Sequence, residues 1–208
     1  MISRTAGQSL FTRVLEAKNI PIVIGSGPAG TGKTFIASYI GAQKLASGEV
    51  QKLILTRPAV SVDEQHGYLP GSIEQKMDPW TRPMFDSLKK YFTKRHIDSF
   101  LNNGVIEICP LAYMRGRTFD KSWIIADEMQ NSTPNQMKMV LTRIGEDSKL
   151  VVTGDVSQCE KGFENINGLE DILLRIGMGV PGISHVQFQE NEVVRHEIIK
   201  AVIELYQK

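Results

Sequence analysis

The chain has 208 residues, of which 41% are hydrophobic and 23% charged, and this composition predicts a soluble protein with a packed core. The formal net charge is only +1, so any contact with nucleic acid must come from a local patch. The N-terminus has no apolar segment and no apolar run reaches about 18 residues, so we expect neither export nor a membrane span. Cys109 and Cys159 have neither metal-ligand spacing nor a disulfide framework, which is typical of a reducing, cytoplasmic compartment.

The first predicted element is an amphipathic helix over Ser9 to Lys18, where apolar residues recur along one stripe. Gln8 sits just ahead of it. The amide of Gln8 can both donate and accept hydrogen bonds, which suits the edge of an adenine ring. A solvated polar residue is the alternative interpretation.

A strand, a glycine-rich loop and a second helix follow without interruption. Ile20 to Ile24 is a short apolar strand, and Gly27 to Thr34 fits the P-loop pattern of glycine, four residues and Gly-Lys-Ser/Thr. Backbone N–H groups of such a loop wrap a phosphate, and the start of the helix adds partial positive charge. A glycine-rich turn without a ligand is the alternative, but the flanking strand and helix favour a P-loop.

The P-loop predicts a site for ATP and Mg²⁺. Lys33 can reach the β- and γ-phosphates, and Thr34 can ligate the metal ion. The helix is expected to end near Ser47, with Gly48 just after it. The predicted nucleotide-binding residues are Gln8, Gly27, Pro28, Ala29, Gly30, Thr31, Gly32, Lys33 and Thr34.

A strand over Lys52 to Thr56 is continuously apolar, as a parallel sheet covered on both faces requires. Pro58 cannot continue a central strand, so Arg57 is expected at its carboxyl end. We interpret residues 59–104 as an insertion on the main sheet.

Within the insertion, Asp78 and Pro79 are expected to open a helix that buries Met84, Leu88 and Phe92. The other face of that helix would be basic, either as a solvated surface or as a contact for nucleic acid. The basic residues are Lys89, Lys90, Lys94, Arg95 and His96.

Val105 to Cys109 forms the next predicted strand, and Arg115 and Arg117 follow it on either side of a glycine. Two arginines downstream of a strand end can form a loop that contacts phosphates. A surface loop without function is the alternative.

Trp123 to Glu128 is a buried strand that runs directly into two carboxylates, the arrangement known as Walker B. Asp127 would hold Mg²⁺ opposite Thr34, and Glu128 would act as the general base for the attacking water. An acidic turn at a strand end is the alternative, and the P-loop upstream favours Walker B.

The remaining pattern completes a parallel α/β sheet with helices on both faces. Thr133 to Gln136 is a capping box that opens a helix ending at Gly145. Lys149 to Thr153 is a strand whose carboxyl end leads to Gln158, where a side chain can sense a γ-phosphate or position water. A last strand over Ser184 to Phe188 and a closing helix over Asn191 to Gln207 follow.

Arg195 lies in the first turn of that closing helix, where a cation opposes the helix dipole. A solvated arginine there would be ordinary. An arginine that completes a phosphate site is the functional alternative.

In these residues the chain resembles the PhoH family of P-loop ATPases, which are related to superfamily 1 helicases. The resemblance spans nearly the whole chain, and one departure is Met129, where alanine is the commoner residue. The segments that carry it are Gly27 to Thr34, Leu55 to Pro58, Gly67 to Gly71, Lys76 to Pro79, Arg115 to Thr118, Asp127 to Gln130, Thr153 to Asp155 with Gln158, and Val193 to His196.

The resemblance implies a single RecA-like domain over residues 1–208, ATP hydrolysis with Mg²⁺, ring hexamers and work on RNA. It also implies that Gln8 contacts adenine and that Arg195 is the first candidate for an arginine finger. Nucleic acid, if bound, is expected to contact Arg57, Arg115 and Arg117 through phosphates. The resemblance does not predict a ribonuclease site.

The function predicted from the sequence is therefore ATP hydrolysis coupled to RNA or single-stranded nucleic acid. Because one RecA-like domain supplies half of a helicase-type site, a neighbouring subunit is expected to complete it. An ATP-gated assembly or binding module with slow turnover is the alternative. A small-molecule kinase is a weaker one, because Glu128 beside Asp127 suits activation of water.

Overall fold

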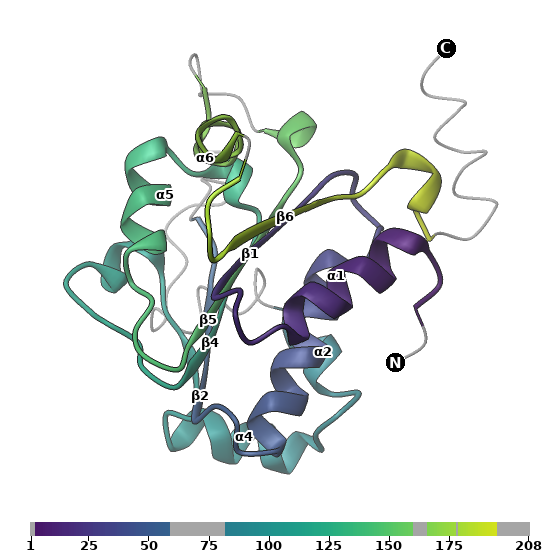
Figure 1. The fold of residues 1–208 in the computed structure, drawn as a ribbon. Coiled ribbons are helices and arrows are strands. Elements are labelled where there is room, and N and C mark those ends of the chain that lie inside the picture. Colours follow the sequence, from purple (N-terminus) through teal and green to yellow (C-terminus); the bar gives the residue numbers. More distant parts are fainter. Residues whose placement is uncertain (1–2, 59–81, 160–165, 178, 195–208) are drawn as a thin grey trace, which may run out of the picture.

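The computed structural model of the chain describes residues 3–58, 82–159, 166–177 and 179–194 (Figure 1). Its centre is a six-stranded sheet in the order β3-β2-β4-β5-β1-β6, and all the strand pairs in it are parallel. This confirms the predicted fold class, a parallel α/β sheet in the RecA-like P-loop arrangement. The strands are β1 (Ile22–Ser26), β2 (Lys52–Thr56), β3 (Ile106–Ile108), β4 (Ser122–Ala126), β5 (Lys149–Gly154) and β6 (Ile183–Gln187).

Helices cover both faces of the sheet. Successive strand residues such as Val23 and Ile24 are both apolar and point to opposite faces, so each face has an apolar cluster that a layer of helices buries. The helices α1 (Ala6–Glu16), α2 (Lys33–Ala46) and α4 (Lys94–Asn102) pack on one face, and α5 (Pro134–Leu141) and α6 (Gly168–Ile176) pack on the other (Figure 1). Short 3₁₀ turns are η2 (Leu111–Met114), η3 (Met129–Asn131), η4 (Val156–Gln158) and η5 (Glu190–Glu192).

The first helix starts earlier than the apolar stripe predicts. Thr5 is its N-cap, and the Thr5 hydroxyl accepts a hydrogen bond from the backbone N–H of Gln8 at 3.2 Å. This cap sets the start of the helix at Ala6, so Gln8 lies in the first turn of α1 and not ahead of it. The helix ends at Glu16, where Ala17 is the C-cap in an extended conformation.

The prediction of a single helix with one basic face is wrong. Helical structure covers residues 82–88, and α4 begins separately after Thr93, whose hydroxyl caps it by accepting from the N–H of His96. Lys89 and Lys90 fall between the two helices, and the ammonium of Lys90 lies 4.7 Å from the centre of the Phe35 ring. The basic residues therefore do not share one helix face, although the predicted core positions Met84, Leu88 and Phe92 are buried. The predicted start of that helix, at Asp78 and Pro79, lies outside the described residues.

Two further elements differ from the prediction in this half of the chain. The capping box of Thr133 and Gln136 is confirmed, but α5 ends at Leu141 and not at Gly145. The helix α6 was not predicted, although Asn167 caps it by accepting from the N–H of Glu170 at 2.9 Å.

The closing helix does not begin at Asn191. η5 occupies that position, and the chain continues in an extended form to residue 194. The rest of the predicted helix lies outside the described residues. None of the helices in the described part of the chain is long and apolar enough to cross a membrane.

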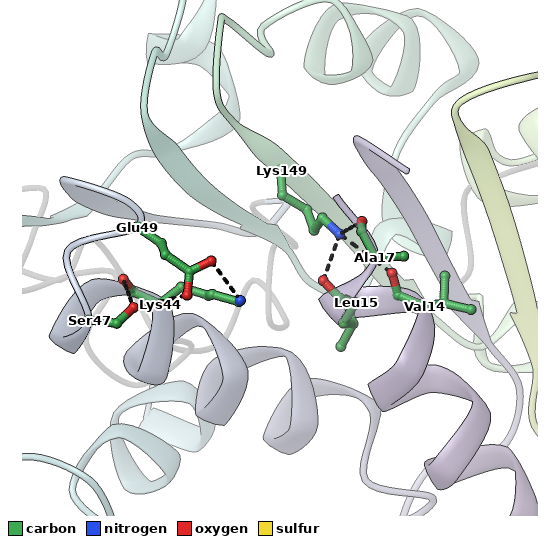
Figure 2. Close-up of polar contacts among 7 residues, drawn as sticks. All are labelled: Val14, Leu15, Ala17, Lys44, Ser47, Glu49 and Lys149. Atoms are coloured by element: carbon green, nitrogen blue, oxygen red, sulfur yellow. Dashed lines mark hydrogen bonds and ion pairs between the residues drawn. The ribbon is translucent and has the colours of Figure 1, made fainter. Parts of the chain in front are cut away.

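Lys149 at the start of β5 forms hydrogen bonds with the carboxyl-terminal end of α1. Figure 2 shows the Lys149 ammonium pointing at the last turn of that helix, where it donates to the carbonyl oxygens of Leu15 at 2.6 Å, Ala17 at 2.7 Å and Val14 at 3.4 Å. Lys149 also lines a cavity of about 590 Å³ at the amino-terminal edge of the sheet. This contact fixes α1 against β5.

Candidate nucleotide-binding site

The P-loop connects β1 to α2 and is held tightly by the segment after β6. Gly27 has a φ of 125°, and a Cβ atom placed there would lie 2.4 Å from the carbonyl oxygen of Phe188. Gly32 has a φ of 89° and forms the N-cap of α2. Glycine is required at both positions, because L side chains rarely adopt these angles.

The Lys33 ammonium lies inside the curve of the loop. It donates to the carbonyl oxygens of Gly27 at 2.6 Å and Pro28 at 2.8 Å. Burial lowers the pKa of Lys33, and the nearby carboxylates of Asp155, Glu128 and Asp127 oppose that shift. The positive charge therefore faces three acids across the site.

Asp127 joins the P-loop to the neighbouring strands. One of its carboxylate oxygens, Oδ1, accepts hydrogen bonds from the hydroxyl of Thr34 at 2.7 Å and from the hydroxyl of Thr153. The side chain is buried, and burial followed by the charge of Glu128 raises the pKa of Asp127. The predicted pair of metal ligands, Thr34 and Asp127, is thus in direct contact.

Glu128 and its neighbours form a hydrogen-bonded chain that sequence reasoning missed. The amide nitrogen of Gln130 donates to Oε2 of Glu128 at 2.5 Å, and the amide oxygen of Gln130 accepts from the N–H of Asp155 at 3.1 Å. Gln130 therefore orients the predicted general base and ties it to the loop after β5. Its only signal in the sequence was its place in the Asp-Glu-Met-Gln segment.

Three of the four predicted catalytic residues, Lys33, Glu128 and Gln158, line one cavity of about 250 Å³ at the carboxyl ends of the strands. Gln158 in η4 reaches it from β5, opposite the P-loop. Pro83 and Ser87 close another side, and these residues were not predicted to take part. The lining residues are Ala29, Gly30, Gly32, Lys33, Thr34, Phe35, Pro83, Ser87, Asp127, Glu128, Gly154, Asp155 and Gln158.

The oxygen donors around this cavity fit Mg²⁺. Thr34 and Asp127 supply a hydroxyl and a carboxylate, the hard ligands that Mg²⁺ prefers. Asp155 also lines the cavity, and its buried Oδ2 atom has no hydrogen-bond partner within the described part of the chain. A second carboxylate is therefore free to accept from a water bound to the metal.

Gln8 contacts the P-loop backbone. Its amide nitrogen donates to the carbonyl oxygen of Thr31 at 3.0 Å, and its amide oxygen accepts from the N–H of Arg4 at 2.8 Å. The side chain is buried. In this arrangement Gln8 supports the loop, and the predicted contact with adenine stays a prediction.

The segment after β6 lies along the P-loop. The N–H of Phe188 donates to the carbonyl oxygen of Ser26 at 2.8 Å, and the N–H of Val194 donates to the carbonyl oxygen of Gly30 at 3.0 Å. Arg195 itself lies outside the described residues.

The three arginines predicted to contact nucleic acid are in different surroundings, and none of them lines the cavity. Arg57 follows β2 and is close enough for its charge to favour the ionised form of Asp127. Arg115 is exposed. Arg117 is engaged with both carboxylate oxygens of Glu107 on β3, and this contact lowers the pKa of Glu107.

Comparison with known proteins identifies the family. The profile of the PhoH-like protein family matches residues 1–207. The chain belongs to the PhoH family. It is 43% identical over 207 residues to a PhoH-like protein of Bacillus subtilis and 36% identical over 209 residues to Protein PhoH of Escherichia coli.

The match covers 99% of this PhoH-family chain in both cases, but only 63% and 58% of those relatives' own length. Among solved structures, the Pif1 helicase of Candida albicans aligns with 99% of this chain and 44% of its own, at 14% identity and a TM-score of 0.44. The family and the fold together make the chain a P-loop NTPase-like protein.

Proposed function

We propose that this PhoH-family chain binds ATP with Mg²⁺, hydrolyses it, and couples hydrolysis to RNA or single-stranded nucleic acid. The observation that carries the proposal is the cavity at the carboxyl ends of the strands. Around it stand a lysine in the P-loop, a hydroxyl bonded to a buried aspartate, and a glutamate next to that aspartate. These are the groups that phosphoryl transfer to water requires.

Each residue around the cavity has a separate role in the proposed reaction. Lys33 would exchange its two carbonyl partners for oxygens of the β- and γ-phosphates, since its ammonium already lies inside the loop. Thr34 and Asp127 would hold Mg²⁺, which when bound neutralises charge on the phosphates. Glu128, oriented by Gln130, would accept a proton from the attacking water, and Gln158 would help to position that water.

Coupling to nucleic acid is supported by exposed arginine near the same edge of the sheet. Arg115 is free to contact phosphates, whereas Arg117 would first have to leave Glu107. We therefore expect Arg115→Ala to weaken binding more than Arg117→Ala. Binding through phosphates should weaken steeply with salt and show little sequence preference.

A ring of subunits, with six as the expected number, would complete the site. One RecA-like domain would supply half of a helicase-type site, so a neighbouring copy would supply the charge that faces the γ-phosphate. An ATP-gated assembly with slow turnover is the competing function, and it uses the same P-loop.

The deciding experiment measures the ATPase rate with and without single-stranded RNA or DNA, with oligomeric mass determined on the same sample. We expect nucleic acid to raise the rate. A flat rate with ATP-dependent assembly would instead support the competing function. Lys33→Ala is the control, because loss of the point charge should abolish hydrolysis and weaken nucleotide binding.

A further inference from the structure

The turn after β3 presents one aromatic ring to solvent. Residues 111–119, called here the Tyr113 turn, begin with η2. Leu111 is 5% exposed and Met114 is fully buried, whereas Tyr113 between them is 58% exposed. Arg115 follows two residues later and is also exposed. The turn thus buries its aliphatic side chains and displays a ring and a cation.

Interactions of Arg117 and Phe119 anchor the carboxyl-terminal end of the Tyr113 turn. Arg117 is bound through two nitrogens to the Glu107 carboxylate on β3, and its guanidinium lies 4.5 Å from the centre of the Phe119 ring. The carbonyl oxygen of Arg117 accepts from Arg143 at 2.9 Å, and the N–H of Phe119 donates to the carbonyl oxygen of Arg143 at 3.0 Å. Arg117 therefore has a structural role in the turn. Tyr113 and Arg115 remain exposed for contact with a ligand.

This geometry meets the physical requirements for holding a single strand. Single exposed aromatic residues are common and need no explanation by themselves. Here the ring stands on a turn that follows the carboxyl end of β3, two residues before a cation, and the nucleotide cavity lies at the carboxyl ends of the strands. Every base has a face that can stack on a ring, and ordering a tyrosine side chain costs little entropy because only two torsion angles are restricted.

We propose that Tyr113 is a stacking platform for a base of single-stranded nucleic acid and that Arg115 contacts an adjacent phosphate. The inference rests on the proposed coupling to nucleic acid and assigns a base-contacting residue to it. It gives sequence-tolerant binding, because stacking depends weakly on base identity whereas phosphates are common to all strands.

The test uses fluorescence anisotropy with a labelled oligouridine and with an abasic ribose-phosphate oligomer of equal length. Tyr113→Ala should weaken binding of oligouridine roughly 5- to 150-fold, the range typical of one lost base stack. It should leave binding of the abasic oligomer unchanged. Tyr113→Trp and Tyr113→Phe should retain binding, because both keep a flat ring.

Salt titration separates the two roles. The slope of log affinity against log salt should be unchanged in Tyr113→Ala and shallower by about 0.7 in Arg115→Ala, the value for one phosphate contact on a single strand. Tyr91→Ala is the matched control, since Tyr91 is 40% exposed and its ring packs against Tyr39. That variant should bind both oligomers like the wild type.

Four results would overturn the inference. Equal loss on the oligouridine and on the abasic oligomer would show that the ring does not stack on a base. Wild-type affinity in Tyr113→Ala, with RNA-stimulated hydrolysis intact, would remove Tyr113 and leave the proposed function standing. A lower oligomeric mass in Tyr113→Ala with unchanged RNA affinity would make the ring a contact between subunits. If the wild type binds neither oligomer, the proposed coupling fails together with the inference.

Discussion

Glu128 occupies an unusual backbone position. Its φ of 54° and ψ of 40° lie in the left-handed region, which costs a residue with a Cβ atom about 1 kcal/mol. Such positions persist only when their surroundings hold them, and they cluster at functional sites. Here the hydrogen bond from Gln130 to the Glu128 carboxylate helps to stabilise this backbone conformation.

Replacement of this carboxylate separates binding from hydrolysis. Glu128→Gln should bind ATP and Mg²⁺ normally, because Thr34 and Asp127 are untouched, and should hydrolyse ATP at least about 10²-fold more slowly. Isothermal titration calorimetry with Mg²⁺ and ATP, followed by single-turnover assays, measures the two effects. Near-normal turnover would remove Glu128 from the mechanism.

A second prediction at this scale concerns Gln8. Both atoms of its amide are bonded to the backbone, at Thr31 and Arg4. If support of the P-loop is its main role, Gln8→Ala should raise the KM for ATP and for GTP by similar factors. A larger rise for ATP than for GTP would instead establish the contact with adenine. Steady-state kinetics with both nucleotides distinguishes the two.

At the scale of elements, α1 is the part that links distant ends of the sheet. Its first turn supports the P-loop through Gln8, and its last turn is held by Lys149. Burial, followed by the charge of Lys44, lowers the pKa of Lys149 to about 8 from an ordinary value of 10.5. The carbonyl oxygens at the helix end favour the ammonium form, so Lys149 is protonated at neutral pH.

This shift predicts how stability depends on pH. Between about pH 8 and 10.5 the unfolded chain holds the Lys149 proton more often than the folded chain, so stability rises with pH across that window. Relative to Lys149→Met, the wild type should gain at most about 3 kcal/mol from pH 8 to 10.5. Urea unfolding of both proteins at several pH values measures the gain. Lys89→Met, at an exposed ion pair with Asp86, is the variant that controls for loss of a surface charge.

The sequence predicted correctly those elements whose structure is determined by residues close together in the chain. The P-loop, the bounds of β2 and the capping box of α5 each depend on residues within one short segment. The prediction failed where partners far away in the chain decide the outcome. The Lys90 ring contact with Phe35 and the bonds of Gln130 to Glu128 and Asp155 are of that kind.

At the scale of the whole molecule, the P-loop is enclosed by segments from both ends of the described chain. Gln8 holds it from one side, and Phe188 and Val194 hold it from the other. Val194 is the last residue of this segment that the structure describes, and Arg195 follows it in the sequence. Arg195 is thereby covalently attached to a residue whose N–H is bonded to the loop.

The proposed arginine finger can be tested by mixing two inactive proteins. Arg195→Ala and Glu128→Gln would be combined under conditions that allow subunits to exchange. If Arg195 acts on a neighbour's nucleotide, some interfaces regain an intact pair and part of the ATPase activity returns. If it acts within its own subunit, the mixture stays inactive. Wild-type turnover in Arg195→Ala alone would rule out both forms, because an arginine finger contributes about 10³–10⁵ in rate elsewhere.

The strand that carries the P-loop leaves the ribosome well before both of its neighbours in the sheet. Ile22 pairs with Leu150 on β5 and with Ile183 on β6. At about 5–20 residues per second, the interval before Leu150 is made lasts about 6–26 s. The bonds that shape the loop, from Gly27 to Gly154 and from Val194 to Gly30, form after that. The proposed binding of ATP would therefore require strands that are made late, and it would report that these strands are in place.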